Sequence, residues 1–163
     1  MAEAPRAAFQ ACVRTPFATL GITATDTHLT GIRFLTPSTP ALAPKRGTIA
    51  HLACVQLQAY LDNGRFEFDL PLAMSGTHHR LAVWEAMQRI PAGATRTYGE
   101  LARDIRSSAR AVGGACGANP IPVVVPCHRV IAAGGDLGGF MGERCEGFER
   151  DIKRWLLEHE GAL

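Results

Sequence analysis

A cysteine and a histidine are adjacent in the C-terminal half of the chain, at Cys127 and His128, with Arg129 directly after them. A thiolate is a strong, soft nucleophile, and a nearby cation lowers the pKa of the thiol that forms it. Three prolines and an apolar run, within residues 120–126, lead into this pair. Because β-branched residues favour a buried strand and proline ends strand pairing, residues 120–126 predict a buried strand that stops at the cysteine.

The pair alone is consistent with four uses of Cys127. A cysteine hydrolase would need a histidine from elsewhere in the fold, because neighbours on a strand point to opposite faces. A redox cysteine is expected near a second cysteine, which the surrounding sequence does not supply. Displacement at a saturated carbon needs neither an oxyanion hole nor an acyl intermediate. The fourth use is structural, a small buried cysteine beside a packed histidine.

The composition is typical of a globular protein, with 47% hydrophobic and 20% charged residues in a chain of 163. That length suits one domain or two small lobes. No apolar run approaches the roughly 18 residues of a membrane span, and residues 1–6 contain no apolar segment of a signal peptide. We therefore expect a cytoplasmic protein with no membrane partner.

Five cysteines are scattered along the chain without a Cys-x-x-Cys pair. An odd, scattered set predicts reduced thiols rather than a disulfide framework. It also predicts no metal site, because adjacent residues such as Cys127 and His128 cannot easily bind one metal ion together.

The net charge is only +2, but it is unevenly distributed. Residues 80–129 contain seven arginines and three acidic residues, whereas residues 130–163 contain four basic and seven acidic residues. A basic middle built from arginine suits a phosphate-bearing partner, although an ordinary solvated surface would have the same charge.

The elements that would position this chemistry begin with a small α/β lobe at residues 1–75. Apolar alternation on both sides of residues 25–28 predicts a β-hairpin, followed by a proline-rich loop. Helical spacing of apolar residues predicts a helix at residues 49–61, and alternation predicts a half-buried strand at residues 66–72. No residue pattern in this lobe indicates chemistry.

Helices dominate the prediction after residue 75. One is expected at residues 78–89, and an amphipathic one at residues 148–159. Between them, a capping box of Thr97 with Glu100 begins a short helix, and a serine pair caps another that ends near residue 117. Two short helices joined by a tight turn predict a helix-turn-helix, which commonly places its second helix against DNA but also occurs in proteins that bind nothing.

The second helix of this unit contains Gly113, Gly114 and Gly117, with Arg110 on the same side. Glycine inside a helix costs about 1 kcal/mol relative to alanine, so three glycines need a compensating gain. Close approach of another surface would supply it. That surface is either a neighbouring helix of the same chain or, as Arg110 favours, nucleic acid.

Four segments resemble, in order and length, the catalytic domain of the O(6)-alkylguanine-DNA alkyltransferases, also called methylated-DNA–protein-cysteine methyltransferases. They are IPAGATRTYGELA at 90–102, ARAVGGA at 109–115, NPIPVVVPCHRV at 119–130 and WLLEHE at 155–160. The resemblance covers residues 77–160.

This resemblance implies an α/β fold in two parts: a ribonuclease-H-like α/β lobe at residues 1–75, and a winged helix-turn-helix domain at residues 76–163 that binds DNA and accepts the alkyl group. It implies repair of O(6)-alkylguanine in double-stranded DNA, with O(4)-alkylthymine as a second candidate substrate. The protein would bind the minor groove as a monomer, without a cofactor, and transfer the alkyl group irreversibly to Cys127, once per molecule. A non-catalytic lesion sensor of the same fold would lack the acceptor cysteine.

The resemblance also implies roles for single residues. Cys127 matches the alkyl acceptor, His128 the residue that draws off its proton through water, and Glu160 the carboxylate that polarises this histidine. Tyr98 matches the tyrosine that assists base extrusion and donates a hydrogen bond to guanine N3. Arg110 matches the arginine that enters the base stack in place of the extruded nucleotide.

The remaining implied contacts are to the groove and to the extruded base. The DNA-contacting glycines would be Gly99, Gly113, Gly114 and Gly117. Asn119 matches the asparagine that braces the turn before the acceptor, and the base pocket would comprise Asn119, Val130, Phe140 and Met141. Two of these residues depart from common relatives. Phe140 replaces a tyrosine and so removes a hydroxyl, and Met141 replaces a small polar residue, within a longer segment at 141–150.

Overall fold

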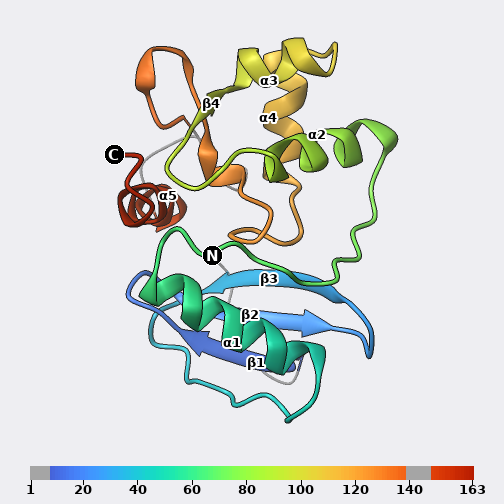
Figure 1. Cartoon of the computed structure of the whole chain (residues 1–163), viewed down its shortest axis with the longest axis vertical. Helices are drawn as coiled ribbons and strands as arrows, with labels where there is room; N and C mark the ends of the chain where they lie inside the picture. The colour runs from blue at the N-terminus through green and yellow to red at the C-terminus, as the bar shows by residue number, and fades with distance from the viewer. Residues whose placement is uncertain (1–7, 139–147) are drawn as a thin grey trace. The chain divides into compact units, whose positions relative to one another are not determined.

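The computed structural model describes residues 8–138 and 148–163. The chain divides into two compact units, Met1–Met74 and Ser75–Leu163 (Figure 1). Each unit has its own buried apolar residues. No helix in the described part of the chain is long and apolar enough to cross a membrane.

The first unit is a three-stranded antiparallel sheet with one helix across it (Figure 1). Its strands are β1 (Ala11–Arg14), β2 (Thr19–Ala24) and β3 (Leu29–Leu35), and the helix is α1 (Ile49–Asp62). The hairpin predicted around residues 25–28 is confirmed as β2 and β3, with Leu20 opposite Phe34 and Ile22 opposite Ile32. These four side chains are buried. The predicted helix is also confirmed, and Thr48 caps its first turn.

The predicted strand at residues 66–72 is wrong. This segment is irregular and makes a single bridge, between Leu72 and Leu29. Its backbone is satisfied by a side chain instead of a strand partner, because Gln56 donates to the carbonyl of Asp69 and accepts from its N–H, both at 2.8 Å. The alternating phenylalanines pack on each other, with ring centres 5.5 Å apart for Phe66 and Phe68. Alternation here reflects aromatic packing rather than a pleated strand.

The second unit contains the predicted helices. They are α2 (His78–Gln88), α3 (Tyr98–Asp104), α4 (Ala109–Gly117) and α5 (Phe148–His159). The capping box of Thr97 with Glu100 is present at the start of α3, and Ser108 caps α4. Helices α2 and α4 are joined through the core by buried Trp84, whose indole N–H donates to the Ala115 carbonyl at 2.8 Å.

A short parallel pairing organises the rest of this unit. Strand β4 (Arg96–Thr97) pairs with β5 (Val130–Ile131), which directly follows the 3-10 turn η2 (Cys127–Arg129). A second 3-10 turn, η3 (Ala133–Gly135), comes next. Because α3 starts immediately after β4, the pairing brings the first residue of α3 to the segment that carries Cys127.

The predicted strand at residues 120–126 is also wrong, although the segment is buried as expected. It is a tight turn in which the Val125 N–H donates to the Ile121 carbonyl at 2.9 Å, and Val123 has a positive φ of 75°. Asn119 replaces the missing strand partner. Its amide donates to Val125 O at 2.8 Å and accepts from Ile121 N at 3.0 Å.

Candidate active site

Cys127 is the first residue of η2 and is only 2% exposed. Burial raises the pKa of its thiol to about 11, although a hydrogen bond from Asn119 and the nearby charge of Lys153 act in the opposite direction. At neutral pH the resting side chain is therefore a protonated thiol. A nucleophilic role requires a base that removes this proton as the thiol reacts.

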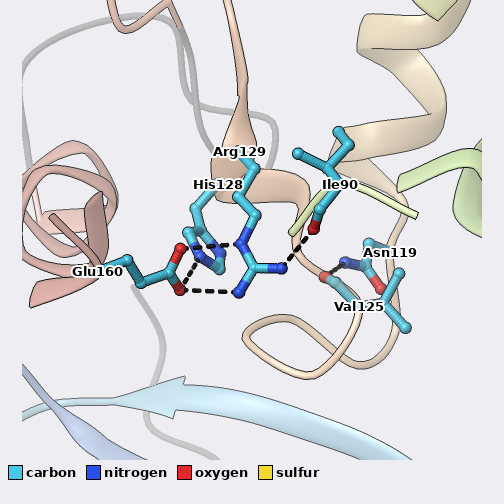
Figure 2. A network of polar contacts seen from close by, with 6 residues as sticks. All are labelled: Ile90, Asn119, Val125, His128, Arg129 and Glu160. Atoms are coloured by element: carbon cyan, nitrogen blue, oxygen red, sulfur yellow. Dashed lines mark hydrogen bonds and ion pairs between the residues drawn. The ribbon is translucent and has the colours of Figure 1, made fainter. Parts of the chain in front are cut away.

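The next residue, His128, makes a buried hydrogen bond with Glu160, the residue after α5. Its Nε2 lies 2.7 Å from Glu160 Oε2, and both side chains are fully buried (Figure 2). Burial lowers the pKa of His128, and the contact with Glu160 only partly opposes this. The imidazole is therefore neutral at rest, with its Nε2 proton directed at the carboxylate. The sequence-predicted pairing of these two residues is present.

The other ring nitrogen of His128 is unusual. Nδ1 is buried, and among the described residues it meets no hydrogen-bonding partner. When Nε2 donates to Glu160, Nδ1 is the basic nitrogen of the ring. His128 can therefore accept a proton at Nδ1 while Glu160 stabilises the resulting positive charge.

Arg129 completes the network around this carboxylate (Figure 2). It donates from Nε to Glu160 Oε1 at 2.8 Å, from Nη2 to Oε2 at 3.1 Å, and from Nη1 to the Ile90 carbonyl at 2.6 Å. Burial acts to raise the pKa of Glu160, but the hydrogen bonds from His128 and Arg129 and the charge of Arg129 outweigh it and hold the value at about 2. Glu160 is thus ionised throughout the physiological range.

Lys153 is a buried cation in the same site that the sequence analysis missed. Its Nζ donates to the Val130 carbonyl at 2.7 Å and to the Tyr98 hydroxyl at 3.4 Å, and lies 5.6 Å from the centre of the Tyr98 ring. Burial lowers its pKa to about 8, opposed by the neighbouring thiols of Cys127 and Cys116. A signal was available, because Lys153 and Leu157 lie four residues apart on α5, and Glu160 follows three residues later, directly after the helix.

The predicted residue Tyr98 lies at the start of α3 and is half-buried. Burial raises the pKa of its hydroxyl, and the nearby thiols of Cys116 and Cys127 add to this effect, so the hydroxyl keeps its proton and can donate it. The structure thus brings Tyr98 to the Lys153 ammonium and to the neighbourhood of Cys127. Val130 is fully buried in β5. Phe140 and Met141, predicted for the base pocket, lie outside the described residues.

The predicted DNA-contacting residues lie on α3 and α4. Arg110 and Gly114 are exposed, as is Gly99 on α3, whereas Gly113 and Gly117 are half-buried. A Cβ added at Gly113 or Gly114 would meet no atom within 4 Å among the described residues outside the adjacent backbone of α4 itself. Close packing against another helix of the chain therefore does not explain these two glycines. Their bare backbone faces open space.

The remaining described side chains offer little for other chemistry. No group of three or more His, Cys, Asp or Glu residues converges as a metal site in the described ranges. The described cysteines, Cys12, Cys54, Cys116 and Cys127, form no disulfide with one another. The first two belong to the other unit, and Cys116 points its thiol at the sulfur of Met87, 3.6 Å away.

Comparison with known proteins decides the family. Residues 78–162 match the family model described as 6-O-methylguanine DNA methyltransferase, DNA binding domain. A methylated-DNA–protein-cysteine methyltransferase of Mycobacterium bovis is 42% identical over 154 residues, which are 91% of this chain and 89% of that protein. The chain belongs to the methylated-DNA–protein-cysteine methyltransferases.

Other members of the methyltransferase family are also similar to this chain. A relative of the same name from Methanosarcina acetivorans is 47% identical over 109 residues, 66% of each chain. The structure of Mycobacterium tuberculosis OGT in complex with DNA superimposes with a TM-score of 0.78 at 39% identity, covering 93% of this chain and 91% of that one. Membership selects alkyl transfer from DNA to a cysteine, a reaction of DNA repair, over the hydrolase, redox and purely structural uses of the Cys-His pair.

Proposed function

We propose that this protein repairs O(6)-alkylguanine in double-stranded DNA by transferring the alkyl group to Cys127, once per molecule. The observation that carries the proposal is that buried Cys127 directly precedes His128, which shares a buried network with Glu160. A thiol with a raised pKa is followed by a neutral histidine whose Nδ1 meets no partner among the described residues and whose Nε2 contacts an ionised carboxylate. Such a network can remove one proton inside a site that excludes bulk water.

The first step is loss of the Cys127 proton. A water carries it to Nδ1 of His128, and Glu160 stabilises the imidazolium through Nε2. The Lys153 ammonium and the Asn119 amide stabilise the thiolate, since both act to lower the pKa of Cys127. The thiolate therefore forms at the moment of reaction rather than in the resting protein.

The second step is displacement at the alkyl carbon. The sulfur forms a bond to this carbon while the bond from carbon to guanine O6 breaks, and the electron pair of that bond passes to the guanine ring. Tyr98 donates a hydrogen bond to guanine N3 and so stabilises the negative charge of the leaving base. The product is a thioether, which the site has no means to cleave. Each molecule therefore reacts once.

Access to the lesion requires the base to leave the DNA stack, because a buried thiol cannot reach O6 in line within a duplex. The glycines of α4, of which Gly114 is exposed, allow its backbone to lie close to the minor groove, together with Gly99 at the start of α3. Arg110 occupies the gap left by the extruded nucleotide. Val130 and Asn119 border the pocket that receives the base.

We also assign a fold to each of the two units, on the basis of the family resemblance. Residues 76–163 form a winged helix-turn-helix built on α3 and α4, and residues 1–75 form a ribonuclease-H-like lobe. The protein acts as a monomer, because one chain contains every residue assigned to the reaction. We place it in the cytoplasm, where thiols such as Cys127 stay reduced. O(4)-alkylthymine is a second substrate of the same pocket.

The experiment is a labelling reaction with duplex DNA that carries isotope-labelled methyl at guanine O6. Label should reach a plateau of one methyl per protein, and peptide mass spectrometry should locate it on Cys127. The Cys127→Ser variant should take up none. Cys116→Ala is the matched control, because it removes the neighbouring thiol and should leave labelling intact. Label on Cys116, or turnover beyond one equivalent, would refute the proposal.

A further inference from the structure

The turn between α3 and α4 places an arginine where the backbone favours glycine. Helix α3 ends in a Schellman motif: Arg106 N donates to Arg103 O at 3.3 Å, and Ser107 N donates to Ala102 O at 2.8 Å. Arg106 follows the helix cap Ile105 and directly precedes Ser107, with a φ of 56°. Glycine is the usual residue at this position, because a side chain in the left-handed region is strained. Arginine here therefore carries a cost in stability.

Nothing within the described part of the chain offsets this cost. Arg106 is exposed, and its guanidinium makes no ion pair or side-chain hydrogen bond with a described residue. The acidic residues of the surrounding helices are already paired. Glu85 lies 2.8 Å from Arg89, and Arg96 contacts both Asp104 at 2.7 Å and Glu100 at 3.9 Å.

The place of Arg106 beside the start of α4 indicates which kind of ligand its charge would bind. Arg106 comes two residues before Ser108, the cap of α4, and four before Arg110, which is also exposed and has no carboxylate partner among the described residues. The start of a helix adds a partial positive charge and unpaired backbone N–H groups. Guanidinium and helix start together suit one chemistry, a phosphate oxygen.

We propose that Arg106 binds a phosphate of the DNA backbone beside the site where α4 enters the groove. This inference rests on the proposed function for its ligand, double-stranded DNA. It assigns to the turn a positioning contact that is independent of sequence and of the lesion. Because a phosphate contact releases a counterion, it should appear in the salt dependence of binding.

The test is binding of unmodified duplex DNA across a range of salt concentrations, with thermal unfolding measured in parallel. Arg106→Gly should raise the melting temperature, because glycine adopts the same φ without strain. The same variant should weaken DNA binding by about eightfold at ~0.1 M salt and reduce the slope of log K against log[salt] by about 0.9, the value for one phosphate. Arg106→Lys should retain most of the slope.

A matched control is Arg89→Gln, which removes an equal charge from an arginine already paired with Glu85. Its slope should stay near that of the wild type. Equal slope losses in the two variants would mean a general effect of net charge and would overturn the assignment. An unchanged slope in Arg106→Gly would also overturn it. Binding of unmodified DNA does not involve Cys127, so failure of the alkyl-transfer proposal would be seen separately, in the labelling reaction.

Discussion

Arg129 donates to both carboxylate oxygens of Glu160, at 2.8 and 3.1 Å, while the same carboxylate contacts Nε2 of His128. The carboxylate thus serves two buried partners at once. One contact anchors the residue after α5 to the last residue of η2, and the other fixes the ring of His128. One charged group thus contributes both to the stability of the fold and to the reaction. Changes at Glu160 should therefore affect both the unfolding free energy and the rate of alkyl transfer, and the two effects can be measured separately.

Glu160→Gln should slow alkyl transfer and destabilise the fold. An amide cannot stabilise the imidazolium of His128 as a carboxylate does, so we expect the rate constant to fall by roughly 100-fold, within the usual range for impaired general base catalysis. Leaving Arg129 buried without its anionic partner should cost about 3–5 kcal/mol of unfolding free energy. Single-turnover kinetics at a temperature where the variant is folded, with urea unfolding, would measure the two effects. Wild-type kinetics in the folded variant would exclude Glu160 from the reaction.

Acid should remove the stabilising contribution of Glu160. Its folded-state pKa is about 2, below the ordinary value of 4.5, so the folded state favours the ionised form. Stability from this group is therefore fully present above pH ~4.5 and is lost as the pH falls from there toward 2. A shift of this size corresponds to about 3 kcal/mol. Urea unfolding of the wild type and of Glu160→Gln should give stabilities that differ at pH 7 and converge near pH 2. A constant difference across this range would contradict the ionic role.

Lys153→Met should make Cys127 less reactive. The variant keeps the length of the side chain but removes the ammonium that favours the thiolate. If the thiol pKa rises by about one unit, the thiolate fraction at neutral pH falls about tenfold. The measurement is the pH profile of Cys127 alkylation by iodoacetamide, which should move to higher pH. Arg154→Met, at an exposed position on the same helix, should leave the profile unchanged. A lower melting temperature with an unmoved profile would show that Lys153 is purely structural.

Most of the helices could be predicted from the sequence because capping residues next to each helix end determine where it begins. Thr97 with Glu100, and Ser108, cap α3 and α4 as expected. The two wrong strands have a common cause. In each segment a side-chain amide satisfies backbone groups that a strand would pair. Asn119 does so for residues 120–126, which follow it directly, and Gln56 of α1 does so for residues 66–72. A pattern of apolar residues indicates that a segment is buried, but it does not indicate which groups form hydrogen bonds with its backbone.

The site was predictable where residues are adjacent or match a family motif, and less so where the fold alone brings them together. His128 and Glu160 were predicted as partners from the resemblance, and they meet at 2.7 Å. The burial of Lys153 was not predicted, because a lysine on an amphipathic helix is normally solvated. Only the pairing of β4 with β5 places the Val130 carbonyl and Tyr98 within its reach.

Gly114→Ala should make the protein more stable and a poorer DNA-repair protein. Alanine in an exposed helical position stabilises by up to about 1 kcal/mol relative to glycine, and the added Cβ would meet no atom of the described residues within 4 Å. The same methyl group would project toward the groove and hold the α4 backbone away from DNA. We expect weaker duplex binding and slower repair of duplex DNA, with an unchanged reaction toward the free O(6)-alkylguanine base.

Arg110→Ala provides the comparison, because it should also slow duplex repair more than reaction with the free base, but without the gain in stability. Thermal unfolding, duplex binding and single-turnover labelling of both substrates would be measured for the two variants. A Gly114→Ala protein that binds duplex DNA like the wild type would remove this face of α4 from the interface. A loss of stability would instead mean that Gly114 is needed for packing within the chain. Because Gly114→Ala should raise stability while it weakens DNA binding, a general loss of folding cannot explain the expected result, and this variant tests the α4 surface directly.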